Sequence, residues 1–327
     1  MRVLIVCSGN SPNEQQFNIK VHQAFIYEQV ESLKLLNVEF DFFLVTGSGI
    51  IGYLKNYPSL LKKIKSFDPD FIHAHYGFSG LLACLQRKIK VITTYHGSDI
   101  NPLSKVGHAR VKHINIFSFL ALKLSYYNIF VSDELLQISA QKTNCSVIPC
   151  GVSLNIFFEQ TKEESRKKMH LMPNKKYVLF ASSFDVPVKN YPLSKNAIDL
   201  VKDCELIEMK GFNRNEVALL MNACDVLMVT SRNESGPLVV KEAMACNCPI
   251  VSTDVGDVRH VIGDTEGCYI ADFDPTDVAE KIKLALQFSK TRGRTNGRPR
   301  IIELGLDDEN IATKIIKVYE KVLFGGK

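Results

Sequence analysis

Apolar and polar positions along the first half of the chain alternate between two periodicities. Short, β-branched apolar runs predict buried strands, and each is followed by a segment with helical spacing. The predicted strands are Val3–Cys7, Phe40–Val45, Phe71–His75, Val91–Tyr95, Asn128–Ser132 and Cys145–Pro149. The predicted helices are Val21–Leu36, Leu60–Phe67, Gly80–Gln86, Ile114–Tyr126 and Glu134–Lys142. This rhythm is typical of a doubly wound α/β domain with a parallel sheet.

The second half repeats the same rhythm after a Pro- and Gly-containing segment, Ile148–Phe158, which indicates a domain boundary. Its predicted strands are Tyr177–Ser182, Glu205–Met209, Val226–Thr230 and Pro249–Ser252. Its predicted helices are Pro192–Lys202, Asn213–Asn222, one starting at Pro237, Pro275–Phe288 and Asp308–Leu323, with a basic polar loop at Lys290–Arg300. We therefore expect two Rossmann-like domains, residues 1–152 and 153–306, and a final helix in 307–327.

Composition and charge exclude several classes of protein. A length of 327 residues suits two domains, and no run of 18 apolar residues predicts a membrane span. The opening MRVLIVCSGNS reads as a buried strand rather than a signal peptide, and nine cysteines without a CxxC pair indicate reduced thiols in a cytoplasmic protein. The net charge of +5 lies in residues 1–150, but no basic motif interleaved with aromatics predicts nucleic-acid binding.

One stretch, Val226–Gly256, carries the clearest candidate chemistry. A polar turn, Ser231–Gly236, separates its first strand from a helix predicted to start at Pro237. Free amides of Ser235–Leu238 at the positive end of a helix dipole form a natural anion site, and Gly236 lets a phosphate approach the backbone. Glu234 and Glu242 bracket this helix start, where a capping or solvated role and a functional role fit the geometry equally well.

The string Glu-Ser-Gly-Pro-Leu-Val-Val-Lys-Glu-Ala within this stretch resembles the Glu-x7-Glu signature of family 4 (group 1) glycosyltransferases, which are retaining, use nucleotide sugars and have the GT-B fold. The connector IPCGVSLNIFF resembles the same family, with Ser153 in place of its usual Asp. The resemblance extends over nearly the whole chain. It implies two Rossmann-like domains facing each other across a cleft, with the final helix crossing back to the first domain.

The resemblance also implies roles for residues of the second half. Glu242 would accept from the ribose hydroxyls, Glu234 would contact the donor sugar, and Lys189 with the Gly236–Leu238 amides would stabilise the leaving diphosphate. The implied donor-binding set is Ser183, Lys210, Gly211, Ser235, Gly236, Pro237, Leu238, Val239 and Glu242. Ser183 stands where the family has an Arg, which removes a bidentate phosphate contact.

In the first half, Thr94–Asp99 follows a predicted strand. A His before a Gly in a turn is more often structural, but the resemblance makes His96 a catalytic residue that faces the donor sugar; for Asp99 the two interpretations balance. The first loop, with Gly9 and Asn10, would contact phosphate or acceptor, although it is no dinucleotide-binding fingerprint.

His73 and His75 share one strand face and would form part of the cleft wall. A metal site there would need a third ligand that the sequence does not supply nearby, and GT-B enzymes generally need no divalent ion. We therefore expect neither metal nor cofactor.

The segment Leu54–Phe67 carries Lys55, Lys62, Lys63 and Lys65 beside apolar residues. It is either an ordinary amphipathic surface helix or a peripheral contact with the inner face of an anionic membrane, where lipid-linked acceptors are found.

The expected activity is retaining transfer of a sugar from a nucleoside-diphosphate sugar to an acceptor hydroxyl of a glycan or lipid-linked glycan. The family resemblance implies a role for this enzyme in the assembly of bacterial cell-surface polysaccharide or lipopolysaccharide. Two alternatives stay open: a nucleotide-sugar epimerase on the same fold, and a non-catalytic glycosyltransferase-like binding subunit, which the loss of Arg at Ser183 favours.

Overall fold

The computed structural model describes residues 1–10, 17–101 and 111–325, and it divides into two compact units. The first unit comprises Met1–Cys150 and Glu309–Lys327, and the second comprises Gly151–Asp308. The sequence predicts the two junctions at 152/153 and 306/307, close to where the chain passes between units. The first unit is therefore discontinuous in sequence, whereas the second is a single stretch.

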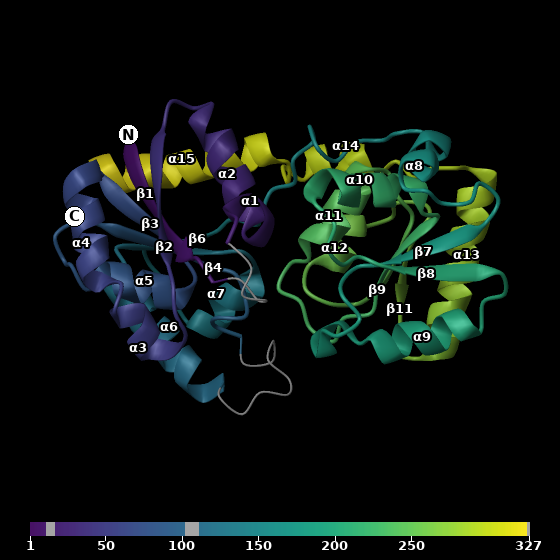
Figure 1. Ribbon diagram of the computed structural model, residues 1–327, viewed down its shortest axis with the longest axis horizontal. Helices are drawn as coiled ribbons and strands as arrows, with labels where there is room; N and C mark the ends of the chain where they lie inside the picture. Colours follow the sequence, from purple (N-terminus) through teal and green to yellow (C-terminus); the bar gives the residue numbers. More distant parts are fainter. Residues whose placement is uncertain (11–16, 102–110, 326–327) are drawn as a thin grey trace. The chain divides into compact units, whose positions relative to one another are not determined.

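The first unit contains a six-stranded, wholly parallel sheet in the order β2-β1-β3-β4-β5-β6 (Figure 1). The strands are β1 (Arg2–Ser8), β2 (Glu39–Val45), β3 (Phe71–His75), β4 (Val91–Tyr95), β5 (Tyr127–Phe130) and β6 (Cys145–Val147). Val3 and Ile5 pack on one face, and Leu4 and Val6 on the other, because successive side chains of a strand alternate. A continuous apolar run is needed since helices cover both faces.

The helices of this unit are α1 (Ile19–His22), α2 (Ala24–Lys34), α3 (Gly49–Leu54), α4 (Tyr57–Phe67), α5 (Gly77–Cys84), α6 (Val111–Leu124), α7 (Asp133–Ser139) and α15 (Asp308–Phe324). Residues of α2 and α15 share one core with the sheet, and those of α4 and α5 share the opposite one. The predicted helix Val21–Leu36 is present as α2, but its predicted start is wrong, because Gln23, whose backbone (φ −135°) is not helical, separates α2 from α1. In the described part of the chain, no helix has the length and apolarity to cross a membrane.

Helix α15 supplies a large share of the first unit's core. Ile311, Ile315 and Val322 are buried against residues of β1, β3 and α2. Tyr319 is fully buried, and its hydroxyl lies 2.6 Å from Nδ1 of His73 in β3. A helix that follows the whole second unit in sequence therefore completes the unit that β1 starts.

The second unit has a five-stranded parallel sheet in the order β11-β10-β9-β7-β8. The strands are β7 (Lys176–Phe180), β8 (Cys204–Glu208), β9 (Val226–Val229), β10 (Ile250–Thr253) and β11 (Cys268–Ala271). The helices are α8 (Lys162–Lys168), α9 (Tyr191–Asp199), α10 (Arg214–Ala223), α11 (Leu238–Ala245), α12 (Val258–Ile262), α13 (Pro275–Thr291) and α14 (Gly297–Glu303), with a 3₁₀ turn at Pro187–Lys189. Helices α9 and α13 cover one face, and α10, α11, α12 and α14 cover the other.

The predicted basic loop Lys290–Arg300 is wrong at both ends, because α13 continues to Thr291 and α14 begins at Gly297. Its last four residues belong to α14, and three of its four arginines, Arg294, Arg298 and Arg300, donate to backbone carbonyls. Arg298 donates to the carbonyls of Phe157 (2.7 Å) and Leu154 (3.0 Å), and Arg300 donates to that of Val261 (2.8 Å). A guanidinium has five donors, so it can satisfy several such carbonyls at once, which a polarity pattern does not reveal. The short elements α8, α12 and β11 were also not predicted.

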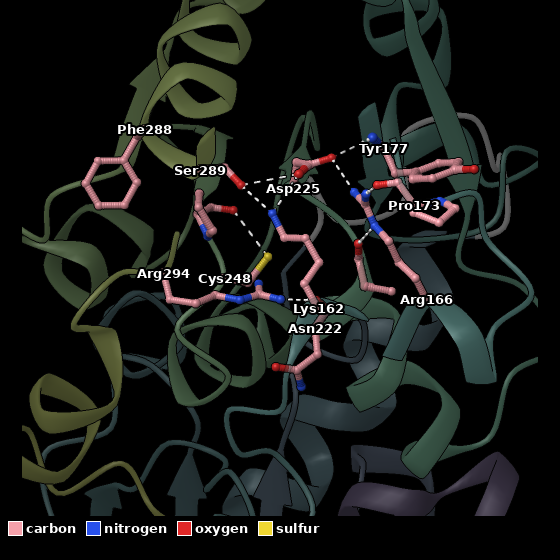
Figure 2. A network of polar contacts seen from close by, with 12 residues as sticks. Lys162, Arg166, Pro173, Tyr177, Asn222, Asp225, Cys248, Phe288, Ser289 and Arg294 are labelled. Carbon is pink, nitrogen blue, oxygen red and sulfur yellow. Dashed lines mark hydrogen bonds and ion pairs between the residues drawn. The ribbon is translucent and has the colours of Figure 1, made fainter. Parts of the chain in front are cut away.

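Asp225, which precedes β9, connects several elements of the second unit (Figure 2). Its carboxylate lies 2.7 Å from Lys162 Nζ and 2.9 Å from Arg166 Nη2, and it accepts from the amide of Tyr177 at 2.8 Å. The carboxylate and the Arg166 guanidinium are mostly buried. These bonds join α8, the start of β7 and the start of β9, so Asp225 has a structural role.

Replacing Asp225 with Asn should destabilise the second unit by about 3 kcal/mol, because removing one member of a buried ion pair leaves uncompensated charge. Urea unfolding of the variant and the wild type measures the difference. Asp254→Asn is the matched control, since its pair with Arg259 is largely exposed and should matter little. Equal stability of the two variants would show that the Asp225 pairs are not structural.

Candidate functional site

The loops that carry the predicted donor site all follow the carboxyl ends of strands in the second unit. Ser183 comes after β7, Lys210 after β8 and Ser231–Pro237 after β9. Every strand pair in this sheet is parallel, so these loops gather along one edge. That edge is where open α/β sheets bind ligands.

Glu234 and Lys189 lie in direct contact. Lys189 Nζ is 2.5 Å from Oε1 of Glu234, and the Ser231 hydroxyl donates to the same oxygen at 2.6 Å. Both charged side chains are only partly exposed. The structure thus brings together two of the three predicted catalytic residues, in a pair that fixes the carboxylate while leaving part of it open to solvent.

Glu242, one turn into α11, is almost fully buried and forms an ion pair with Arg214, whose Nη1 lies 2.5 Å from Oε1. Arg214 begins α10 and lies over the ring of Phe157, 4.6 Å from its centroid. Arg214 was not predicted from the sequence. A signal was available, because it follows the Lys210-Gly211 loop at the carboxyl end of β8, where a cation can reach an anionic ligand.

The turn between Glu234 and α11 provides no side-chain cap for the start of the helix. Pro237 is the N-cap rather than the first helical residue. The first-turn amides of this eight-residue helix are therefore free of side-chain competition for an anion. Leu238 and Val239 pack against the core beneath, and Ser235 is buried, so the turn is anchored from below.

Two further residues, Lys241 and Asp257, lie beneath this turn and were not predicted. The Lys241 side chain is fully buried, with Nζ 3.1 Å from Oδ2 of Asp257. A Cβ on Gly236 would lie 3.2 Å from that same oxygen. Gly256 adopts φ +55°, and a side chain there would meet the carbonyl of Glu234 at 2.9 Å. Gly236 and Gly256 therefore allow a close approach of two loops that larger residues would prevent.

The remaining predicted donor residues form a separate group. The Ser183 hydroxyl contacts Asp185 and lies 2.9 Å from Glu208, and Lys210 forms an exposed pair with Asp185 at 2.9 Å. Gly211 adopts φ +80° in open space. Ser183 thus stands among carboxylates where the family's Arg would stand, and it offers an anion no positive charge.

In the first unit, Gly9 and Asn10 shape the loop after β1. The Gly9 amide donates to the carbonyl of Val45 at 2.8 Å, and a Cβ there would lie 2.8 Å from that of Leu44. The Asn10 amide group exchanges two hydrogen bonds with the backbone of Gly47, at 2.8 and 2.9 Å. Both residues hold this loop against the loop after β2.

His73, His75 and His96 form a stacked column at the carboxyl ends of β3 and β4, with ring centroids 4.5 and 5.3 Å apart. Nδ1 of His75 lies 3.1 Å from Nε2 of His96. His73 is fully buried, and both its nitrogens are bonded, to Tyr319 and to Thr94. Burial lowers the pKa of His73 and of His96 to about 3 and that of His75 well below its usual range, and the neighbouring rings lower it further for His73 and His75. His96 is therefore neutral near pH 7, so it can form hydrogen bonds but brings no positive charge to a ligand.

Asp99 organises the turn that contains His96. Its carboxylate accepts from the amides of Gly77 (3.1 Å), Gly97 (3.0 Å) and His96 (3.2 Å). Burial raises the pKa of Asp99, and these amide bonds oppose the rise. Beside it is a pocket of about 290 Å³ within the first unit, lined by Ser8, Gln23, Tyr53, Tyr76, Phe78, Ser98 and Asp99. Across residues 1–10, 17–101 and 111–325, no group of three His, Cys, Asp or Glu side chains is placed to hold a metal ion.

Models of two glycosyltransferase families match the two halves of the chain. A model of glycosyltransferase family 4 matches residues 2–156, and a model of group 1 glycosyl transferases matches residues 190–298. The putative teichuronic acid biosynthesis glycosyltransferase TuaC of Bacillus subtilis is 27% identical over 68% of this chain and 64% of its own length, so the match spans just under two thirds of that relative. The Campylobacter jejuni N,N'-diacetylbacillosaminyl-diphospho-undecaprenol alpha-1,3-N-acetylgalactosaminyltransferase is 25% identical over 83% of this chain and 82% of its own.

Solved structures match the fold along the whole chain. Sucrose-phosphate synthase from Thermosynechococcus elongatus has a TM-score of 0.83 at 17% identity, covering 99% of this chain and 100% of that one. Anabaena HepE in complex with UDP-glucose has a TM-score of 0.74 at 12% identity, covering 98% and 100%. The protein is thus an α/β glycosyltransferase with the GT-B fold. Within that class it belongs to family 4, the group 1 glycosyltransferases.

The neutral histidines make the first unit sensitive to acid. In the unfolded chain a His binds a proton below about pH 6.5, whereas folded His73 resists protonation down to about pH 3. Stability should therefore fall as pH decreases from 6.5, by up to about 1.4 kcal/mol per pH unit for each such His. Urea unfolding at pH 7, 6 and 5 should show a shallower decline for His73→Gln than for the wild type. The exposed His260→Gln serves as control, and an unchanged slope in His73→Gln would contradict the assignment.

Proposed function

We propose that this glycosyltransferase moves a sugar from a nucleoside-diphosphate sugar to an acceptor hydroxyl with retention of anomeric configuration. The observation that carries the proposal is the Lys189–Glu234 pair at 2.5 Å beside the uncapped N-terminus of α11. A cation, a carboxylate and a set of backbone amides at one sheet edge are the groups that a sugar diphosphate requires. The HepE structure is a complex with UDP-glucose, and its similar fold supports a donor of this class.

In this proposal two carboxylates contact different parts of the donor. Glu242 accepts hydrogen bonds from the ribose, and its pair with Arg214 holds it in position. Glu234 contacts the donor sugar, while Lys189 and the backbone N–H groups of Gly236 and Leu238 stabilise charge that develops on the leaving diphosphate. Lys189 must exchange part of its contact with Glu234 for the diphosphate, so donor binding rearranges this pair. His96 in the first unit supports the sugar in the same proposal, as a neutral hydrogen-bonding group.

Retention needs either two inversions or attack on the face that the leaving group departs from. Two inversions would need a carboxylate nucleophile, and we assign none in the second unit. The Glu234 carboxylate is already bonded to Lys189 and to the Ser231 hydroxyl. We therefore favour front-side displacement, in which the new glycosidic bond forms as the sugar–phosphate bond breaks. A phosphate oxygen of the leaving diphosphate takes the acceptor proton. Lys189 and the α11 amides supply the positive charge, so the proposed step involves no divalent ion.

The acceptor is proposed to be a surface glycan or its lipid-linked precursor. The names of TuaC and of the diphospho-undecaprenol transferase support that class. Helix α4 is the proposed membrane contact. In this helix Lys63 pairs with Asp41, whereas Lys62 and Lys65, together with the preceding Lys55, are exposed. Pelleting with anionic vesicles that persists unchanged in a variant with Gln at all four lysines would remove this contact from the proposal.

Ligand-induced stabilisation tests the donor site. One nucleoside diphosphate at about 100 times its dissociation constant should add roughly 2.7 kcal/mol of stability, visible as a rise in melting temperature. Glu242→Gln and Lys189→Ala should reduce that rise. Lys195→Ala is the matched control, since this exposed lysine pairs with Asp199 away from the turn. No rise with any nucleoside diphosphate or nucleotide sugar would show that the donor site is wrongly placed.

Turnover then separates the proposed transferase from its alternatives. Lys189→Ala should lower kcat about 100-fold, the usual cost of removing one group that stabilises charge on a leaving oxygen. Nuclear magnetic resonance of the product should show the donor's anomeric configuration. Binding without transfer to any acceptor would favour the non-catalytic subunit, which the carboxylate surroundings of Ser183 make the leading alternative. Conversion of the donor without an acceptor would favour the epimerase.

A further inference from the structure

The second unit contains a pocket of about 860 Å³ at the end of its sheet opposite the candidate donor site. It is formed by α8, the segments that precede β7, β8 and β9, and the last turns of α13. The charged residues that line it are Lys162, Arg166, Lys175, Lys176, Lys202, Asp225, Lys283 and Lys290. Seven of these eight are cationic. Because the donor loops follow the carboxyl ends of the same strands, the pocket takes no part in the proposed transfer.

The concentration of cations is not explained by the composition of the unit. Residues 151–308 carry 21 Lys and Arg against 23 Asp and Glu, so the unit as a whole is slightly acidic. One third of its cations nevertheless line this pocket. Like charges in a concave surface repel one another and focus a positive potential, so their clustering favours a bound anion.

Three of the lining residues, Lys162, Arg166 and Asp225, which we call the floor of the pocket, are joined by ion pairs (Figure 2). Arg166 is almost fully buried and donates to the carbonyls of Ala223 (2.9 Å) and Pro173 and to Asp225. Lys162 donates to Asp225 at 2.7 Å and to the Ser289 hydroxyl at 2.8 Å. One carboxylate is therefore shared by two cations, which leaves the floor with excess positive charge.

The rim supplies cations that have not been neutralised. Among the rim lysines, Lys175 is the exception, because it forms an ion pair with Glu205. Lys176, Lys202, Lys283 and Lys290 are exposed, and in the described part of the chain none of them has an acidic partner within ion-pair distance. These four side chains are long enough to converge on a ligand above the floor.

Helix dipoles account for only part of this arrangement. Lys290 lies in the last turn of α13, where the negative end of the dipole attracts a cation. Lys162, in contrast, lies in the first turn of α8, where the dipole disfavours one, and Lys176 begins a strand. A purely local explanation therefore fails for these two residues.

We propose that this pocket binds a polyanion that bears phosphate groups. Its volume falls within the range of small-ligand sites, and lysine ammonium groups around a fixed cationic floor suit several phosphate oxygens at once. The same chemistry is offered by a soluble compound with two or more phosphates and by the headgroup of an anionic lipid. The two sources differ in whether binding needs a membrane.

Calorimetric titration with inorganic tripolyphosphate tests the pocket in the full chain. All proteins carry Lys189→Ala, so that phosphate binding at the candidate donor site is weakened throughout. The rim variant Lys202→Gln, Lys283→Gln, Lys290→Gln should bind about tenfold more weakly or worse, since losing even one charge-assisted hydrogen bond changes affinity by about that factor. The control Lys88→Gln, Lys123→Gln, Lys142→Gln removes the same charge from exposed positions of the first unit outside α4 and should leave affinity within about twofold.

Cosedimentation with vesicles of phosphatidylglycerol, compared with phosphatidylcholine, provides the second arm. In this arm every protein also carries Gln at Lys55, Lys62, Lys63 and Lys65, so that the proposed α4 contact does not contribute. Tripolyphosphate binding that is lost only in the rim variant supports the pocket with a soluble ligand. Binding only to phosphatidylglycerol vesicles, again lost only in the rim variant, supports it with a lipid headgroup. Equal losses in the rim and control variants in both arms, or no binding in either arm, would overturn the proposal. None of these outcomes depends on donor binding or on transfer, so the proposed function is tested separately.

Discussion

Parallel pairing of β7, β8, β9 and β10 is the constraint on which the candidate site depends. It sends every loop that follows a strand to one edge of the sheet and every loop that precedes a strand to the other. Residues 45 positions apart, Lys189 and Glu234, meet for this reason. The same rule collects the lysines before β7 and β8 at the opposite edge. One topological rule thus creates two differently charged ends in a domain that is close to neutral.

Electrostatic pairing decides how these ends differ. Around the turn before α11, three carboxylates each pair with a cation: Glu234 with Lys189, Glu242 with Arg214 and Asp257 with Lys241. Charge is balanced there before a ligand arrives, and the uncapped amides of α11 supply the anion preference. At the opposite edge a single carboxylate, Asp225, pairs with two cations, and Lys176, Lys202, Lys283 and Lys290 lack acidic partners among the described residues. The donor edge therefore suits a ligand with both polar and ionic parts, whereas the opposite edge suits a ligand that is recognised by its negative charge alone.

Periodicity predicted the strands well because parallel strands are continuous apolar runs, and β3 and β4 have the bounds that the sequence predicts. It failed where polarity does not report exposure. Arg298 and Arg300 looked solvated but bind carbonyls, and Gln23 divides a helix whose apolar spacing continues through it. The paired residues Glu234 and Lys189 came from a motif and its family resemblance. Arg214 and Lys241 were missed because a cation's partner depends on which loops the sheet brings together, and that information is absent from local sequence.

The division of the chain has a consequence for how the protein is made. The second unit is a single stretch, so all of it is synthesised before α15. The first unit starts earlier but lacks Ile311, Ile315 and Tyr319 until the ribosome has passed the whole of the second. Until then one face of its sheet, and the buried His73 that contacts Tyr319, have no cover from α15. Of the two units, the one that begins first in synthesis is therefore the one that finishes folding last, and a nonsense mutation just before α15 would damage the amino-terminal half of the protein.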